Sequence, residues 1–364
     1  MKPFCLYSLL VLLALPVHAA EFYFPGSDDD WETVDPAAVG WNAELLSRAL
    51  DVAGARNSSG VVILHQGRIL AERYWQGPDN ATYRNFLTGT DEAGRAIEDV
   101  ASAQKSVVAV LTGIAQQKGF IALDDPVNKH LEAGWSQASR EHEEAIILRH
   151  LLSMTSGLAE DLSLVSAPGQ TWFYNTPAYH MVMRVLTAAT GKDRNELTSD
   201  WLSKPLGMTH TSWTSRPWAD AAIGAGLSTT ARDLARFGLM IQAGGQWQDQ
   251  VVMADPDFLQ AMLSPSQTLN PAYGYLWWLN GQQFSLAPGA QAPRQDGPLI
   301  KAAPADLLAM LGAGDRKLYL VPSLDLVVTR LGFTGGSPDS SFNEAFWTAL
   351  IKAAPSAART ARAQ

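Results

Sequence analysis

The sequence predicts an α+β fold in which an antiparallel sheet, flanked by helices, is formed from the N- and C-terminal parts of the chain and carries an inserted helical lobe. Strand-like runs occur near both ends, at 61–75 and 307–331, whereas helical patterns dominate the stretch between them. The 364 residues are 47% hydrophobic and 17% charged, which is enough apolar material for one large core. We therefore expect one globular unit of two lobes over residues 20–364.

The first residues have the pattern of an export signal. Lys2 gives a positive start, residues 9–15 are apolar, and Val17-His18-Ala19 resembles a small-residue cleavage site. The apolar stretch is short for a membrane span, although an uncleaved anchor is the alternative. The sequence thus predicts a signal peptide over 1–19 and a periplasmic or secreted protein with no stable span after its removal.

The composition argues against several function classes. A net charge of −9 without a run of Lys and Arg disfavours nucleic-acid binding. The only cysteine, Cys5, lies in the predicted signal, so the mature chain would have no disulfide, Cys-ligated zinc or cysteine nucleophile. The seven histidines are scattered without metal-ligand spacing. We expect no metal and no cofactor, and a small-molecule substrate.

The expected elements follow in chain order. The first part of the sheet lobe, about 35–101, contains a helix over 42–53 and a hairpin whose strands, 61–64 and 69–75, are separated by Gln66-Gly67. The helical lobe, about 102–225, contains a nearly all-apolar and therefore buried helix from Ser102 to Lys118, and helices over 146–154 and 177–190.

The second part of the sheet lobe covers about 226–352. Ser228-Thr229-Thr230 predicts the start of a helix that continues through Phe237. The stretch 281–304 has the composition of a long surface loop, and three strands follow at 307–311, 317–321 and 326–331. A closing helix over 342–352 precedes an Ala/Arg-rich tail, 353–364, that we expect to be disordered.

A serine and a lysine stand at i and i+3 in Ser102-Ala103-Gln104-Lys105, which places them on one helix face. A serine hydroxyl needs a neighbouring base to become a nucleophile, and lysine can be that base only when neutral. Burial and the positive end of the helix dipole would both lower its pKa. The motif predicts Ser102 as nucleophile and Lys105 as base; the alternative is a capping serine beside a surface lysine.

The segment from Glu98 to Ser106 resembles the nucleophile segment of the class C β-lactamase-like and penicillin-binding-protein-type serine hydrolases. Further segments resemble the same family in the same order, over about 35–352. They are Leu123-Asp124-Asp125-Pro126-Val127, the segment from Arg149 to Leu158, the segment from Gly226 to Leu234, Tyr273-Gly274-Tyr275-Leu276-Trp277-Trp278, and the segment from Val321 to Val328.

The resemblance implies a third catalytic side chain, a tyrosine that relays a proton to the leaving group. Its counterpart is Tyr174, with a packing tyrosine as the alternative. The family has a Tyr-x-Asn pattern, and Thr176 stands where its asparagine is usual. The amide that would orient substrate is therefore lost, supplied by Asn175, or replaced by the hydroxyl of Thr176.

The resemblance also implies a strand with Lys-Thr-Gly or His-x-Gly, whose cation attracts a substrate carboxylate. The counterpart here is Met310-Leu311-Gly312 or Gly312-Ala313-Gly314, and neither carries a cation. An oxyanion hole needs only N–H donors, so we assign the backbone of Ser102 and Ala313 to it. Gly312 and Gly314 would let substrate approach closely; the alternative is an ordinary glycine-rich strand end.

Together these residues favour a serine hydrolase that cleaves an ester or amide bond through an acyl-enzyme. Without the cation, esterase or amidase activity is favoured over the alternatives, a β-lactamase or a D-amino-acid peptidase. A non-catalytic cell-wall or ligand-binding protein is the alternative from another class. Four aromatic residues, each of which could instead belong to the core, are candidates for an apolar pocket: Trp172, Tyr275, Trp277 and Trp278.

Overall fold

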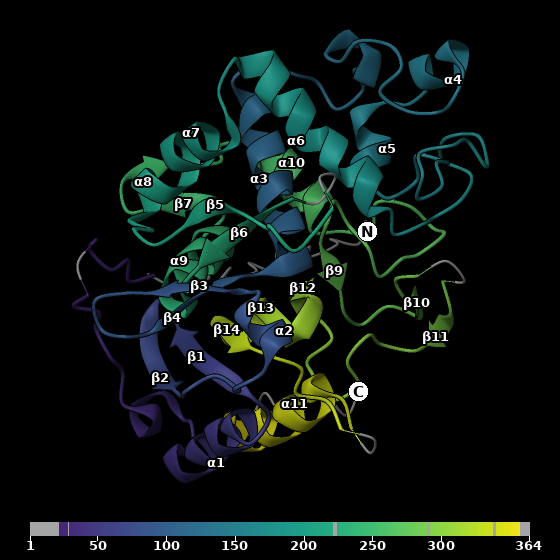
Figure 1. Ribbon diagram of the computed structural model, residues 1–364. Helices are drawn as coiled ribbons and strands as arrows, with labels where there is room; N and C mark the ends of the chain where they lie inside the picture. Colours follow the sequence, from purple (N-terminus) through teal and green to yellow (C-terminus); the bar gives the residue numbers. More distant parts are fainter. Residues whose placement is uncertain (1–21, 28, 221–223, 290–291, 338–339, 357–364) are drawn as a thin grey trace, which may run out of the picture.

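The computed structural model describes residues 22–27, 29–220, 224–289, 292–337 and 340–356 (Figure 1). The predicted signal, 1–19, lies outside these residues. A six-stranded antiparallel sheet has the order β2-β1-β14-β13-β12-β9. Its strands are β1 (Ser58–His65), β2 (Arg68–Tyr74), β9 (Trp278–Leu279), β12 (Leu308–Gly312), β13 (Arg316–Val321) and β14 (Leu326–Gly332).

The N- and C-terminal parts of the fold meet where β1 pairs with β14, from Ser58 opposite Gly332 to His65 opposite Leu326. This pairing confirms the predicted sheet built from both terminal parts. The turn of the β1–β2 hairpin is at Gln66 and Gly67, both with positive φ, as the turn signal in the sequence indicated.

Helices cover both faces of this sheet (Figure 1). On one face α1 (Ala43–Gly54) packs against α11 (Phe342–Ala353), and Trp347 of α11 contacts Tyr319 of β13. On the other face lies α9 (Ala231–Gln242), where a side chain at Gly238 would collide with Leu318. Because successive strand residues point to opposite faces, Leu318 and Tyr319 serve the two layers in turn.

The helical lobe is built around α3 (Gln104–Gln117), which is buried along almost its whole length. Around it lie α4 (Arg140–Glu144), α5 (Leu148–Leu152), α6 (Thr176–Thr190), α7 (Arg194–Thr198) and α8 (Lys204–Leu206) (Figure 1). One helix from beyond residue 226, α10 (Pro256–Met262), also packs on α3, where the missing side chain of Gly113 makes room for Phe258. The segment after 226 thus contributes to both lobes.

A second sheet, which the sequence analysis did not predict, has the order β3-β4-β6-β5. Its strands, β3 (Leu87–Thr90), β4 (Ala96–Asp99), β5 (Ser212–Ser215) and β6 (Ala225–Thr229), are short, so their sequence signal is weak. The expected loop 281–304 was also wrong in part, because it contains the paired strands β10 (Phe284–Leu286) and β11 (Arg294–Asp296). Of the expected tail, α11 includes Ala353, Ala354 is buried, and 357–364 lie outside the described residues.

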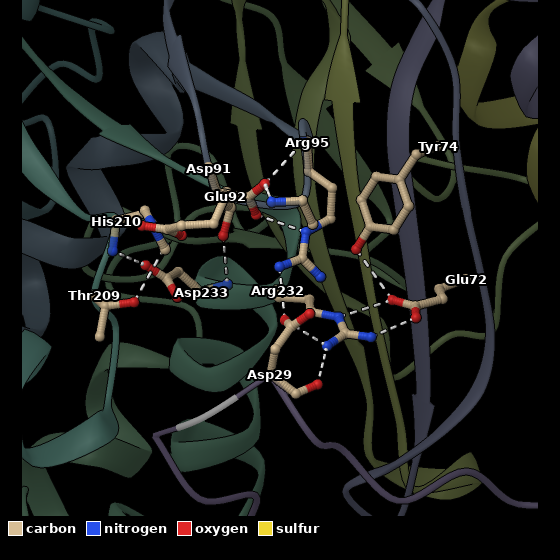
Figure 2. A network of polar contacts seen from close by, with 12 residues as sticks. Asp29, Glu72, Tyr74, Asp91, Glu92, Arg95, Thr209, His210, Arg232 and Asp233 are labelled. Carbon is tan, nitrogen blue, oxygen red and sulfur yellow. Dashed lines mark hydrogen bonds and ion pairs between the residues drawn. The ribbon is translucent and has the colours of Figure 1, made fainter.

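A polar network fastens the N-terminal segment to the sheet lobe (Figure 2). Asp29 forms ion pairs with Arg95, at 2.6 Å, and with Arg232, at 2.8 Å. Arg232 also pairs with Glu72 of β2, whose carboxylate accepts the Tyr74 hydroxyl at 3.0 Å. The network joins α9, β2 and the β3–β4 hairpin.

In the part of the chain that the structure describes, no helix combines the length and the hydrophobicity needed to cross a membrane.

Candidate active site

Ser102 lies on the turn that connects β4 to α3. Between Glu98 and Ala115 every residue is buried except Ser102. Ala101 before it has a φ of +51°, which a non-glycine residue adopts only under strain, and Asp99 holds it there by accepting its N–H at 2.8 Å. The turn therefore presents one hydroxyl from an otherwise buried segment.

Lys105 is the immediate neighbour of this hydroxyl. Its Nζ donates a hydrogen bond to the Oγ of Ser102 at 3.1 Å, and Lys105 as a whole is only 2% exposed. The ring centroids of Tyr174 and Tyr179 lie 4.9 and 4.7 Å from Nζ. Burial lowers the pKa of Lys105 to about 7, and the positive charge of Arg216 contributes to the shift. A substantial neutral fraction near pH 7 makes Lys105 able to accept a proton.

Tyr174 precedes α6 and faces the same pair. Burial raises the pKa of its phenol to about 12, and a hydrogen bond with the Ser102 hydroxyl moderates the rise. Trp278 stacks on the Tyr174 ring with centroids 5.9 Å apart, and Tyr273 meets it edge-on at 6.1 Å. The hydroxyl of Tyr174 is therefore neutral, and its ring is held in place by neighbouring aromatic side chains.

The four aromatic candidates separate in the structure. Trp172 and Trp278 pack around Tyr174, with ring centroids 6.4 and 5.9 Å from its own. Tyr275 instead accepts a hydrogen bond from Arg149 at 2.6 Å, and Trp277 is fully buried against Phe237. Sequence reasoning missed Tyr273 as a neighbour of Tyr174, although Tyr273 belongs to the quoted segment Tyr273-Gly274-Tyr275-Leu276-Trp277-Trp278.

Asn175 has a structural role that conflicts with the expected substrate contact. It is 2% exposed, and its Oδ1 accepts the N–H of Ala178 as the N-cap of α6. Its Nδ2 donates to the carbonyl groups of Leu158 and Ala159, both at 2.8 Å. With its amide used in this way, Asn175 is not a substrate-orienting group. Thr176, the first residue of α6, is half-buried.

A buried network behind Ser102 was not found from the sequence. The guanidinium of Arg216 binds both carboxylate oxygens of Asp99, at 2.5 and 2.7 Å, and the Gln104 amide oxygen at 3.3 Å. Gly226 gives this pair room, because a Cβ there would lie 2.1 Å from Asp99. Asp99 and Gly226 both belong to the quoted family segments, but Arg216 does not, and no local signal identifies it.

The C-terminal end of β12 packs closely against the turn that contains Ser102. A Cβ at Gly312 would lie 2.2 Å from the carbonyl oxygen of Val100. The space beside Gly312 is therefore filled by the protein's own backbone, whereas the sequence had suggested that substrate would approach there. Gly314 is required by its φ of +71°. The 3₁₀ turn Ala313–Asp315 contacts the turn of Ser102, which brings Ala313 close to the nucleophile segment.

The two cationic residues that follow this turn both form buried ion pairs. Arg316 is fully buried and pairs with Glu98 at 2.9 Å, and Lys317, 5% exposed, pairs with Asp315 at 3.0 Å. The Nη2 of Arg316 is buried and has no hydrogen-bond partner among the described residues. Over the described ranges, no group of three or more His, Cys, Asp or Glu side chains is arranged to hold a metal ion.

The family model for Beta-lactamase matches residues 44–341. The chain belongs to the β-lactamase family. Members of this family are serine hydrolases, which confirms the resemblance, the fold class and the enzyme class expected from the sequence. An uncharacterized protein of Alkalihalophilus pseudofirmus is 24% identical over 326 residues, which are 82% of this chain and 89% of that protein.

Solved structures of the β-lactamase type share the fold. A protein described as a β-lactamase from Bacteroides dorei matches with a TM-score of 0.63 and 20% identity, over 86% of this chain and 98% of its own. A β-lactamase/D-alanine carboxypeptidase from Yersinia pestis, in complex with citrate, matches with a TM-score of 0.58 and 19% identity, over 85% of this chain and 98% of its own.

Proposed function

We propose that this β-lactamase family member hydrolyses ester or amide bonds of small neutral substrates through an acyl-enzyme on Ser102. The observation that carries the proposal is the 3.1 Å contact between Ser102 and a lysine whose burial lowers its pKa to about 7. A serine beside a buried, partly neutral amine is an activated nucleophile.

In the acylation step, neutral Lys105 accepts the proton of Ser102 as Oγ bonds to the substrate carbonyl carbon. The N–H groups of Ser102 and Ala313 stabilise the oxyanion. Tyr174, protonated because burial raises its pKa to about 12, donates its proton to the leaving alcohol or amine and regains one from Lys105. A water molecule then attacks the acyl-enzyme, which releases the acid and restores the serine.

Two features support a neutral substrate at the reacting end. The segment Met310-Leu311-Gly312 carries no cation, and Arg316 and Lys317 are buried in ion pairs. The Yersinia pestis relative, whose name includes D-alanine carboxypeptidase, makes peptidase or β-lactamase activity the second candidate. The pattern of residues 1–19 supports the further proposal that the enzyme is exported.

A fluorophosphonate probe tests the nucleophile and excludes a non-catalytic binding protein. The purified chain should be labelled at Ser102, as read by peptide mass spectrometry, and the label should be lost in Ser102→Ala. A screen of short acyl esters, linear amides, D-Ala-D-Ala peptides and a chromogenic cephalosporin then ranks the substrates. Absence of labelling together with no hydrolysis would refute the proposal.

A further inference from the structure

A cavity of about 600 Å³ lies along α6, beside the Ser102 site. Pro177, His180, Arg184 and Thr187 line it from the helix, and their spacing puts them on one face over about 15 Å. Tyr179 also lines the cavity, and its ring is the one that lies 4.7 Å from Lys105 Nζ. The cavity is therefore separated from the catalytic lysine by a single side chain.

The walls of the cavity are partly apolar. Met181 and Met183 of α6 are 8% and 6% exposed, and Leu162 adds a further apolar side chain. Trp213 of β5 is fixed in place by hydrogen bonds from its indole to Thr198 and from its backbone N–H to Asn195. An apolar molecule, or the apolar part of one, would find a rigid surface here.

Two arginines line the same cavity, Arg184 from α6 and Arg194 from α7. Among the ion pairs of the described residues, neither Arg184 nor Arg194 has a carboxylate partner. The guanidinium of Arg194 lies 5.9 Å from the centroid of the Trp213 ring. The guanidinium of Arg184 contacts the sulfur of Met181 at 3.3 Å. The acids that flank Arg194 in sequence, Asp193 and Glu196, form the capping box of α7. Both guanidinium groups can thus bind a ligand.

His180 adds a polar atom to the cavity wall. Its Nε2 is buried and has no hydrogen-bond partner among the described residues. Burial, with the charge of Lys105 next, lowers the pKa of His180 to about 3, so the ring is neutral near pH 7. A buried polar atom without a partner is costly in a folded protein unless a ligand or water satisfies it.

We propose that this cavity binds an amphipathic organic carboxylate, with its carboxylate on Arg184 and Arg194 and its apolar part against Met181, Met183 and Trp213. Planar guanidinium groups bind carboxylates in a bidentate manner, and the apolar walls favour an organic acid over an inorganic anion. The carboxylate belongs either to a free acid or to the far end of a substrate whose ester or amide bond reaches Ser102. The second source rests on the proposed function, whereas the first does not.

Calorimetry on Ser102→Ala tests the site without catalysis, with octanoate and its neutral analogue octanamide as probes. Octanoate should bind at least about tenfold more tightly than octanamide, and the added changes Arg184→Gln and Arg194→Gln should remove that difference. His180→Phe keeps the shape of the wall and should weaken octanoate binding. Arg140→Gln, an exposed arginine on α4 paired with Glu144, is the matched control and should leave binding unchanged.

Kinetics on the wild-type enzyme then distinguish the two sources of the carboxylate. If the carboxylate belongs to a substrate, the mono-nitrophenyl ester of an eight-carbon diacid should show a KM about tenfold higher in the double arginine variant, while nitrophenyl octanoate should not. If the ligand is a free acid, the arginine changes should leave both KM values unchanged. Binding of octanoate that is absent, or that the double variant leaves intact, overturns the proposal whatever the hydrolysis rates are.

Discussion

Ser102 and Lys105 are joined by a 3.1 Å hydrogen bond at the start of a helix whose next turn is fixed independently, because Ser106 donates its hydroxyl to the carbonyl of Leu276 at 2.7 Å. The two serines lie four residues apart, Ser102 on the turn before α3 and Ser106 within α3. One of them is half-buried beside the lysine, and the other is 2% exposed and belongs to the packing between segments. Exchanging each for alanine separates chemistry from stability.

Ser102→Ala should therefore reduce hydrolysis of nitrophenyl acetate by at least about 10³-fold, since the proposed nucleophile is lost, while the midpoint of urea unfolding changes little. Ser106→Ala should do the opposite. It should retain hydrolysis and lose about 1 kcal/mol of stability, because a buried carbonyl loses its donor. Wild-type rates in Ser102→Ala would disprove the assignment of the nucleophile.

The pH dependence of kcat/KM should follow the ionisation of Lys105. In the proposed mechanism neutral Lys105 is the active form, so the rate should rise with pH around a midpoint of about 7, well below the usual lysine pKa. Stopped-flow hydrolysis of a neutral ester between pH 5 and 9 measures this midpoint. A profile that stays flat, or that Lys105→Ala leaves unaltered, would indicate a different base.

The same burial should make Lys105 costly for stability. Its pKa is about 7 in the folded protein and about 10.4 in an unfolded chain, so between these values the unfolded state binds more protons and stability rises with pH. Lys105→Met removes this cost. The variant should be inactive and, at pH 6, more stable by on the order of 2 kcal/mol, with the gain shrinking toward pH 10. Urea unfolding at both pH values checks it, and a variant less stable than wild type at pH 6 would contradict the argument.

Arg216 should act on catalysis through Lys105. Its charge helps to lower the lysine pKa, so Arg216→Gln should move the kcat/KM midpoint to higher pH. The change also leaves the buried carboxylate of Asp99 without its partner, which should cost about 3–5 kcal/mol of stability. Arg316→Gln, which breaks the buried pair with Glu98, is the control for stability loss and should leave the midpoint in place. Equal midpoints in wild type and Arg216→Gln would refute the coupling.

How well each part of the site could be predicted from the sequence depends on how far apart in the chain the contacting residues lie. Ser102 and Lys105 are one helical turn apart, so their contact is encoded by spacing alone. Arg216 lies 117 residues beyond Asp99, and only the pairing of β4, β5 and β6 brings them together. The close approach of Gly312 to the carbonyl oxygen of Val100 could not be predicted from the sequence either, because it depends on how β12 packs against the Ser102 turn.

Selectivity between neutral and anionic substrates is the remaining test of the proposed function. The β12 segment Met310-Leu311-Gly312 lacks a cation that would hold a carboxylate near Ser102, and the next two cations, Arg316 and Lys317, are buried in ion pairs.

One charge-assisted hydrogen bond is worth about 1.5–3 kcal/mol, so its absence should cost an anionic β-lactam roughly tenfold to a hundredfold in acylation. Nitrophenyl acetate and butyrate need no such anchor, and they can use the proposed oxyanion donors and the proposed Ser-Lys-Tyr catalytic residues in full. We expect a higher kcat/KM for these esters than for a chromogenic cephalosporin, with both measured on one preparation and the Ser102→Ala background subtracted. Faster hydrolysis of the cephalosporin would mean that another group supplies the charge. Arg184→Gln and Arg194→Gln would then show whether the α6 cavity is its source, because only in that case would the cephalosporin rate fall while the ester rates stay the same.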